Sequence, residues 1–220
     1  MIEGKALETH ALIRAIIKEK VSTHARAVSR GDVFLYQGKQ AEHVGIIVSG
    51  TIFAQTYTKD GHTVWVEEFI SNQFIAIESL FSATPLPYEL IAKTETRIIY
   101  LSREKFLNFI KSFDGGIESI LQDISVRLNR ATERLIESNT LSAKGRICAE
   151  LKRHSKPIGI EPDKHIIRPR PVFSEFALRV GSTRESVSRT VSELVRAGVI
   201  LRQTGALVVL DMDEFEAWIR

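Results

Sequence analysis

The hydrophobic pattern of this chain changes its period twice, and each period is typical of a different kind of structure. Between residues 31 and 101, short apolar runs alternate with turns, whereas between residues 117 and 135 the apolar side chains recur at helical spacing. From residue 173 onward, two short helical patterns precede two strand-like runs. A single bundle or a single sheet cannot hold all three patterns. The sequence therefore predicts an α+β chain, and 220 residues suffice for more than one domain.

The first pattern predicts a small antiparallel β-domain. Asp60-Gly61 lies between two alternating runs and indicates a hairpin, because glycine supplies the positive φ that such turns require. Several short strands at this spacing favour a barrel or a jelly roll. The expected strands are Val33–Tyr36, Val44–Val48, Thr51–Tyr57, Thr63–Ile70, Tyr88–Ala92 and Arg97–Leu101. A short helix should precede them, with Leu7, Leu12, Ile13, Ile16 and Ile17 near one face.

The second pattern predicts one long helix with a narrow apolar line. Its apolar residues are four, three, four, three and four positions apart, as in the a and d positions of a coiled coil. The residues of this dimer seam are Ile117, Leu121, Ile124, Leu128, Ala131 and Leu135. We expect the helix to pair in parallel with a second copy and to break near Asn139. The alternative, packing on its own domain, normally shows a wider stripe.

Residues 173–196 favour a helix-turn-helix motif. A first helix would bury Phe176, Ala177 and Val180, and Gly181 would form the tight turn. Ser182, with Glu185 three residues later, matches a capping box that opens the second helix. The buried stripe of that helix would consist of Val187, Val191, Leu194 and Val195.

The opposite face of the second helix carries side chains suited to reading base edges. Arginine donates a bidentate pair to guanine, and glutamate accepts from cytosine. We therefore expect double-stranded DNA to contact Ser182, Thr183, Arg184, Glu185, Ser188 and Arg189. The alternative is that Glu185 only caps the helix at Ser182 and forms an exposed ion pair with Arg189.

The charge of the chain is concentrated near the same motif. Residues 141–210 carry 13 basic and six acidic side chains, a net of +7, although the whole chain has a net charge of only +3. This asymmetry indicates a polyanionic partner, with a solvated basic surface as the alternative. The run Ile200–Val209, turning at Thr204-Gly205, predicts a hairpin wing that would place Arg202 near a phosphate.

Taken together, these segments resemble the CRP/FNR family of bacterial transcription regulators over nearly the full length of the chain. The resemblance rests on Arg30-Gly31, Tyr36–Gly38, Ile46–Ile52, Asp60-Gly61, Lys144–Ile147 and Gly181–Arg189. It implies a jelly-roll sensor domain over residues 1–113, a dimerisation helix and hinge over 114–139, and a winged helix-turn-helix DNA-binding domain over 140–220.

The resemblance also implies a mode of action. A homodimer would read a palindromic, TGTGA-like site through Arg184, Glu185 and Arg189. Ser188 matches members that read TTGAT, but Arg184 favours the first type. The family further implies an activator that contacts RNA polymerase, with repression left open.

The expected effector pocket departs from a cyclic-nucleotide site. Such a site needs a glycine, a glutamate and an arginine followed by serine or threonine, whereas this chain has Ala76, Ile77 and Leu86-Pro87 at those places. Glu78 is one position out of place, so cAMP and cGMP are not the expected effectors. The predicted pocket residues are Ile75, Ala76, Glu78, Leu86, Tyr88 and Thr132. The alternative function is a cyclic-nucleotide-binding regulatory module with a degenerate cassette.

Other classes are disfavoured by composition. The single cysteine, Cys148, excludes an internal disulfide and an iron–sulfur cluster, and we expect it to be a buried thiol. A metal-dependent barrel enzyme would need more converging ligands than His43 and His62. We therefore predict no enzyme activity, no metal and no cofactor. No apolar run approaches the roughly 20 residues of a membrane span, and no signal-peptide pattern is present, which predicts a cytoplasmic protein.

Overall fold

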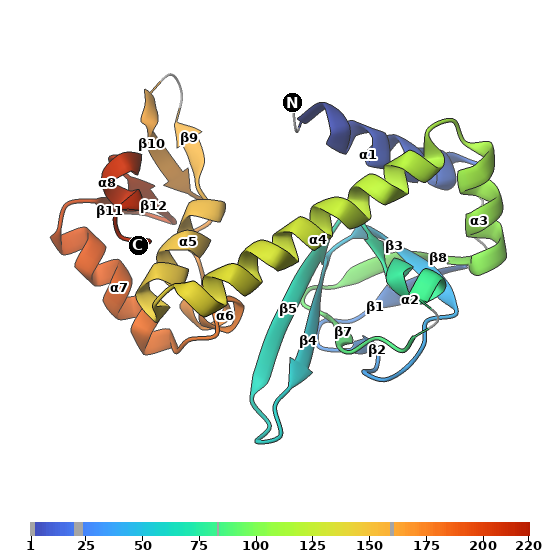
Figure 1. Cartoon of the computed structure of the whole chain (residues 1–220), viewed down its shortest axis with the longest axis horizontal. Coiled ribbons are helices and arrows are strands. Elements are labelled where there is room, and N and C mark those ends of the chain that lie inside the picture. The colour runs from blue at the N-terminus through green and yellow to red at the C-terminus, as the bar shows by residue number, and fades with distance from the viewer. Residues whose placement is uncertain (1–2, 20–23, 83, 159–160) are drawn as a thin grey trace. The chain divides into compact units, whose positions relative to one another are not determined.

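The computed structural model describes residues 3–19, 24–82, 84–158 and 161–220 (Figure 1). Contacts divide the chain into two compact units, Met1–Arg130 and Ala131–Arg220. The long helix α4, Gly116–Thr140, contributes to both units. The α+β fold class is confirmed. The division into three parts at residues 113 and 139 stays a prediction, because the two-unit division does not separate α4 from its neighbours.

The first unit is built on two four-stranded antiparallel sheets, with strand orders β1-β8-β3-β6 and β2-β7-β4-β5. Short helices flank the strands. The elements that precede α4 are α1 (Glu3–Lys18), β1 (His24–Val28), β2 (Val33–Leu35), β3 (His43–Ser49), β4 (Thr51–Tyr57), β5 (Thr63–Ile70), β6 (Phe74–Ile75), α2 (Ile77–Ser82), β7 (Glu89–Ala92), β8 (Thr96–Ser102) and α3 (Arg103–Ser112).

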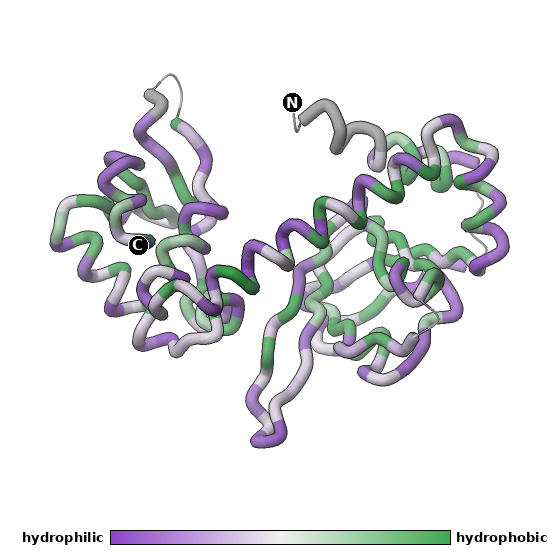
Figure 2. Tube along the Cα trace, in the orientation of Figure 1, coloured by the Kyte–Doolittle hydropathy of each residue, from purple (hydrophilic) through white to green (hydrophobic). Residues whose placement is uncertain are grey.

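Strand alternation gives this unit two apolar cores. Successive side chains of a strand point to opposite faces, so Ile98 joins one core while Ile99 joins the other. The first core holds Ile47, Ile52 and other side chains of the strands, and the second also holds buried side chains of α1, α3 and α4. Figure 2 shows the hydrophobic stretches of the strands in green and the hydrophilic tip of the β4–β5 hairpin in purple.

The turn between β3 and β4 requires glycine. Gly50 has a φ of +96°, a backbone conformation that residues other than glycine rarely adopt. A Cβ at this position would also collide with the backbone of Glu95 and Thr96. The apolar run therefore forms β3, and the glycine that follows Ser49 ends the strand and allows the turn into β4.

All six predicted strands are present, and β4 and β5 have the predicted bounds. The sequence pattern missed β1 because only Val28 among its five residues is buried, and it missed β6, which has two residues. It also missed α2 and α3. In α1, Leu12, Ile13 and Ile16 are buried as expected, whereas Ile17 is exposed and the side chain of Leu7 lies outside the described residues.

The second unit contains, besides the end of α4, four helices and a four-stranded sheet of order β11-β12-β10-β9 among the described residues. Its further elements are α5 (Ala143–Arg153), β9 (Lys156–Ile158), β10 (Glu161–Ile167), α6 (Phe173–Arg179), α7 (Arg184–Arg196), β11 (Ile200–Gln203), β12 (Ala206–Val209) and α8 (Met212–Glu216). The predicted break after α4 is confirmed, since α4 ends at Thr140 and Ser142 caps α5. Cys148 is fully buried, and burial raises the pKa of its thiol to about 12.

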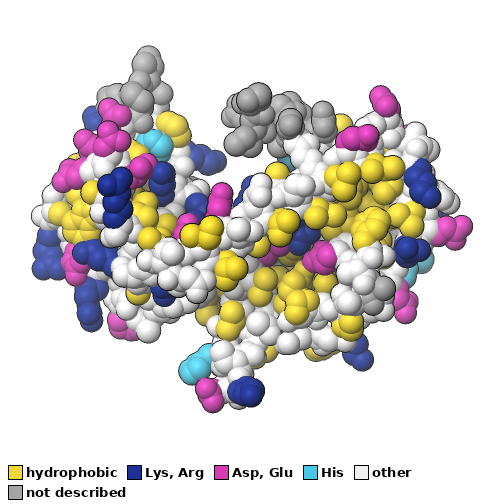
Figure 3. All heavy atoms as spheres, viewed as in Figure 1, with side chains coloured by type: hydrophobic (Ala, Val, Ile, Leu, Met, Phe, Trp, Pro, Cys, Tyr) yellow, Lys and Arg dark blue, Asp and Glu magenta, His cyan; other side chains and the backbone are white. Residues whose placement is uncertain are grey.

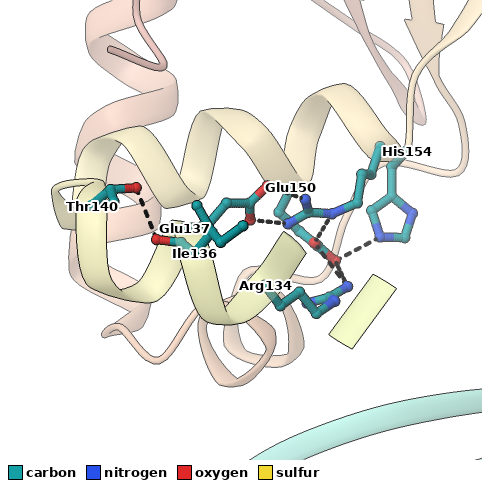
Figure 4. Close-up of polar contacts among 7 residues, drawn as sticks. Arg134, Ile136, Glu137, Thr140, Glu150 and His154 are labelled. Atoms are coloured by element: carbon teal, nitrogen blue, oxygen red, sulfur yellow. Dashed lines mark hydrogen bonds and ion pairs between the residues drawn. The ribbon is translucent and has the colours of Figure 1, made fainter. Parts of the chain in front are cut away.

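A buried carboxylate joins α5 to the last turns of α4 (Figure 4). Glu150 is fully buried, and its carboxylate accepts hydrogen bonds from Nη2 of Arg134 at 3.1 Å and from Nε of Arg153 at 2.8 Å. Nε2 of His154 lies 3.1 Å from the same carboxylate, and Arg153 also holds Glu137 through two contacts of 2.6 and 2.9 Å. The end of α4 is therefore clamped to the second unit by ion pairs.

These partners decide the protonation of Glu150. Burial by itself raises the pKa of the Glu150 carboxyl, but the hydrogen bond with His154 and the charges of Arg134 and Arg153 outweigh burial and lower the pKa to about 2. A folded pKa below the unfolded value of about 4.3 means that the ionised carboxylate stabilises the fold above that pH. This stability is lost as the pH falls through the folded pKa.

We expect Glu150→Gln to lower the free energy of unfolding by about 3 kcal/mol at pH 7, because two arginines lose a buried partner. The difference from wild type should shrink by about 1 kcal/mol per pH unit between pH 4 and the folded pKa, because Glu150 of the unfolded chain binds a proton there while the folded carboxylate stays ionised. Urea unfolding at several pH values measures both effects. Glu133→Gln, at an exposed position of α4, is the control. A penalty equal in both variants, or one independent of pH, would contradict this role of Glu150.

Candidate nucleic-acid interface

The helix-turn-helix motif forms as predicted by α6, a tight turn and α7. Phe176 and Ala177 are buried in the core of the second unit. Gly181 has a φ of +57°, the left-handed conformation that the turn requires. The amide of Ser182 donates to the carbonyl oxygen of Ala177 at 2.9 Å, which ends α6 and directs the chain into α7.

The predicted cap of the second helix is wrong by one residue. Thr183, and not Ser182, is the N-cap of α7, and its hydroxyl accepts a hydrogen bond from the amide of Ser186 at 3.2 Å. Threonine and serine both satisfy the free amides of a first helical turn, so the pattern Ser182-Thr183 did not decide between them. The capping box that would have occupied Glu185 does not form.

The outer face of α7 collects the predicted base-reading side chains. Val187, Val191 and Leu194 are fully buried on the inner side of this helix, and Val195 is partly buried. On the outer side, a shallow hollow of about 370 Å³ is lined by Phe173, Arg184, Glu185, Ser188, Arg189 and Ser192. Within the described part of the chain, neither Glu185 nor Arg189 forms a side-chain hydrogen bond or a close ion pair. The alternative in which these two side chains only pair with each other is therefore not formed.

The predicted wing lies beside this face. β11 and β12 pair as an antiparallel hairpin that turns at Thr204-Gly205. Nη2 of Arg202 donates to the hydroxyl of Ser192 on α7 at 2.9 Å, which fixes the base of the wing to the recognition helix. The guanidinium of Arg202 is exposed.

Two further arginines support the interface, and sequence reasoning gave neither of them a role. Arg146 of α5 donates to the carbonyl oxygens of Leu141 at 3.1 Å and Val180 at 3.0 Å, so it fixes the turn between α6 and α7. Exposed Arg170 lines a second hollow together with Arg184. The pair Gly145-Arg146 contributed to the family resemblance, but a single-letter pattern does not show which carbonyls an arginine contacts.

The predicted effector-pocket residues separate into two groups. Ile75, Ala76, Leu86 and Tyr88 are buried in one core of the first unit, while Thr132 is an exposed residue of the second unit. Ala76 has a φ of +61°, so this alanine adopts the left-handed backbone that glycine would adopt without strain. The hydroxyl of Tyr88 donates to the carboxylate of Glu78.

An arginine that the sequence did not assign to this region completes it. Arg127 of α4 contacts Glu67 at 2.9 Å and Glu78 at 3.3 Å, and its guanidinium lies 4.8 Å from the ring centroid of Phe69. Burial lowers the pKa of Arg127, but the hydrogen bonds and charges of Glu67 and Glu78 outweigh burial and raise it. The sequence has no arginine between Arg30 and Arg97, but the cation of this region comes from the distant helix α4.

The predicted seam on α4 is mostly exposed. Leu128 and Leu135 are 65% and 64% exposed, and Ile117, Leu121 and Ala131 are exposed as well. Ile124 differs, because it packs partly buried against a core of the first unit. Figure 3 shows hydrophobic side chains, in yellow, on the visible surface along α4. Large apolar side chains in such a line are unusual for a surface that water covers.

Among the described residues, no group of three or more histidine, cysteine, aspartate and glutamate side chains could hold a metal ion. In the same part of the chain, we find no helix with the length and apolarity needed to cross a membrane.

Comparisons with known proteins agree with this architecture. The family described as "Cyclic nucleotide-binding domain" matches residues 25–113, and the "Crp-like helix-turn-helix domain" matches residues 145–218. The transcriptional regulator SdrP of Thermus thermophilus is 26% identical over 89% of this chain and 92% of its own length. A CRP-like cAMP-activated global transcriptional regulator of Mycobacterium tuberculosis is 20% identical over 84% of this chain and 83% of its own.

Among solved structures, a CooA mutant from Carboxydothermus hydrogenoformans aligns with a TM-score of 0.76 at 14% identity, covering 91% of this chain and 89% of that one. The two matched domains define the class of protein, a transcription regulator with a DNA-binding helix-turn-helix. The chain belongs to the CRP/FNR family. The relatives are transcription regulators and not enzymes.

The corrected cap gives a direct test of how α7 begins. Thr183→Ala removes the acceptor for the amide of Ser186 and should lower the free energy of unfolding by about 1 kcal/mol. Ser182→Ala, one residue earlier, is the matched control and should have little effect. Urea unfolding of both variants measures the difference. A larger loss in the free energy of unfolding for Ser182→Ala would show that Ser182, as the sequence pattern predicted, caps α7.

Proposed function

We propose that this protein is a homodimeric, sequence-specific transcription regulator that reads a near-palindromic, TGTGA-like site through Arg184, Glu185 and Arg189. The observation that carries the proposal is the hollow on the outer face of α7, which these three side chains line without a hydrogen bond or a close ion pair from their side chains to the described chain. Two arginines and a glutamate offer the donors and the acceptor that a G·C-containing half-site requires. Ser182, Thr183 and Arg202 flank this face and are suited to phosphate contacts.

The exposed line on α4 supports the homodimer. A Leu side chain that becomes buried contributes about 1.5–3 kcal/mol, so covering Leu121, Leu128 and Leu135 with their counterparts gives a substantial driving force. The a/d spacing is that of a parallel two-helix pair. Two recognition helices in such a dimer would enter successive major grooves about 34 Å apart, which requires a near-palindromic operator.

The controlling signal in this proposal is not a cyclic nucleotide. The relative from M. tuberculosis is named as cAMP-activated. In this chain the glycine, glutamate and arginine of a cyclic-nucleotide cassette are replaced by Ala76, Ile77 and Leu86, and the nearby Arg127 already pairs with two glutamates. A phosphate without a free cation would be costly to bury. Contact with RNA polymerase, as in activators of the family, belongs to the same proposal.

The second candidate function is a regulatory module that binds cyclic nucleotides through a degenerate cassette. The φ of +61° at Ala76 favours it, because the glycine that a cassette has at this place would adopt this backbone without strain. This candidate assigns no task to the outer face of α7. Selection of duplex DNA from a random pool, with and without cell extract, separates the two: enrichment of a palindromic sequence supports the regulator, and no enrichment in either condition overturns it.

Base reading by Arg189 has a measurable signature. Arg189→Ala should weaken binding to the selected site by about 1–3 kcal/mol and leave binding to random duplex nearly unchanged. Lys156→Ala, which removes one exposed positive charge outside α7, is the control and should weaken both DNAs slightly and equally. Fluorescence anisotropy at fixed salt measures both. Equal losses on the two DNAs for Arg189→Ala would contradict base reading.

The dimer seam is tested by charge. Leu128→Glu places a carboxylate in the centre of the exposed line, where two copies would bring like charges together in an apolar contact. We expect monomers in analytical ultracentrifugation, with the circular dichroism spectrum retained because Leu128 is exposed in the single chain. Glu133→Ala, off the seam on the same helix, should remain dimeric. A dimeric Leu128→Glu variant would place the interface elsewhere.

A further inference from the structure

Outside the outer face of α7, several polar and titratable side chains surround a cavity in the first unit. The cavity has a volume of about 480 Å³, within the range of small-molecule sites. Residues from α1, from the β5–β6 turn and from α4 line it, among them His10, Asn72 and Gln122. Phe69, Phe74 and Val126 form apolar parts of its wall. None of the pocket residues predicted from the sequence lines this cavity.

The cation at the polar end of the cavity is already engaged. Nε of Arg127 donates to both carboxylate oxygens of Glu67, at 3.1 and 3.2 Å, and Nη2 donates to Glu67 at 2.9 Å. Nη1 and Nη2 each donate to Glu78 at 3.3 Å, while Phe69 covers one face of the guanidinium. An anionic ligand could reach Arg127 only by displacing a carboxylate, and it would then lie beside two negative charges.

One acceptor at the same end has no partner. Oδ2 of Asp123 is buried, and no group in the described part of the chain hydrogen-bonds to it. Burial raises the pKa of the Asp123 carboxyl, and the charges of Glu67 and Glu78 act in the same direction against Arg127 and Arg130. A buried acceptor without a donor costs free energy, and a ligand that supplies the donor recovers it.

We propose that this cavity binds a small molecule with an aromatic or aliphatic body and an ammonium group, with the ammonium donating to Asp123 and the body lying against Phe69, Phe74 and Val126. The lining favours a cation beside Asp123, because Glu67 and Asp123 both line the cavity and Arg127 is paired with two glutamates. Arg130 also lines the cavity and is its second cation, so the test compares an amine with a carboxylate of similar shape. The role of such an amine as the regulatory signal rests on the proposed function; its binding does not.

Matched probes test the proposal on the full-length protein. Isothermal titration calorimetry with 2-phenylethylamine should show saturable binding of one molecule per chain, whereas 3-phenylpropionate and cAMP should not bind. Asp123→Asn should weaken binding of the amine roughly 10- to 100-fold, because a charge-assisted hydrogen bond is lost. Asp114→Asn, an exposed acid that does not line the cavity, should bind like wild type. The asparagine side chain is close in shape to aspartate, and thermal unfolding without ligand verifies that each variant is folded.

The outcomes separate this inference from the function on which it builds. Equal or tighter binding of 3-phenylpropionate or cAMP, unchanged binding of the amine by Asp123→Asn, or no binding of the amine at millimolar concentration each overturns the proposal. The ligand-free protein is assayed in parallel by DNA selection and sedimentation. An intact DNA preference together with failed amine binding contradicts only the cavity assignment, whereas a failed DNA preference contradicts the regulator itself.

Discussion

Helix α4 carries two different apolar faces, one packed against the first unit and one exposed. Both units depend on this helix, because it contributes residues to each of them. One side of the helix buries Ile120 in a core of the first unit and directs Arg127 into a pair of glutamates. Another side leaves a line of large apolar side chains exposed. A helix that only completed its own domain would keep this line polar, so the exposed line is available for the second copy in the proposed dimer.

Some charged side chains of the second unit are buried and paired, whereas those on the outer face of α7 are exposed. Glu150 is fully buried, and three basic side chains surround it, so it is a structural charge that stabilises the junction of α4 and α5. Arg184, Glu185 and Arg189 lie on the surface, and their side chains form no hydrogen bond or close ion pair within the described chain. This arrangement costs little in water, and it leaves their donors and acceptors available for the base reading proposed above.

The sequence predicted those features that repeat along the chain, and missed those that depend on distant contacts. The alternation of β4 and β5, the heptad spacing of α4 and the stripe of Val187, Val191 and Leu194 each repeat within one element, and each was found. The partners of Arg127 are 60 and 49 residues away, and those of Arg146 include a carbonyl 34 residues away, so no local pattern indicates them. The cap of α7 was missed for a different reason: Ser182 and Thr183 are chemically equivalent as caps, and only the backbone path of the turn selects between them.

The chain bends sharply between β6 and α2, at Ala76. Alanine at this corner, with its φ of +61°, carries a strain of about 1 kcal/mol that glycine would avoid. The bend carries the chain directly from β6, which ends at Ile75, into α2, which begins at Ile77. It also places Glu78, in the first turn of α2, where its carboxylate contacts Tyr88 and Arg127. Relaxing the backbone at this one alanine would therefore also move a carboxylate that holds the guanidinium of α4.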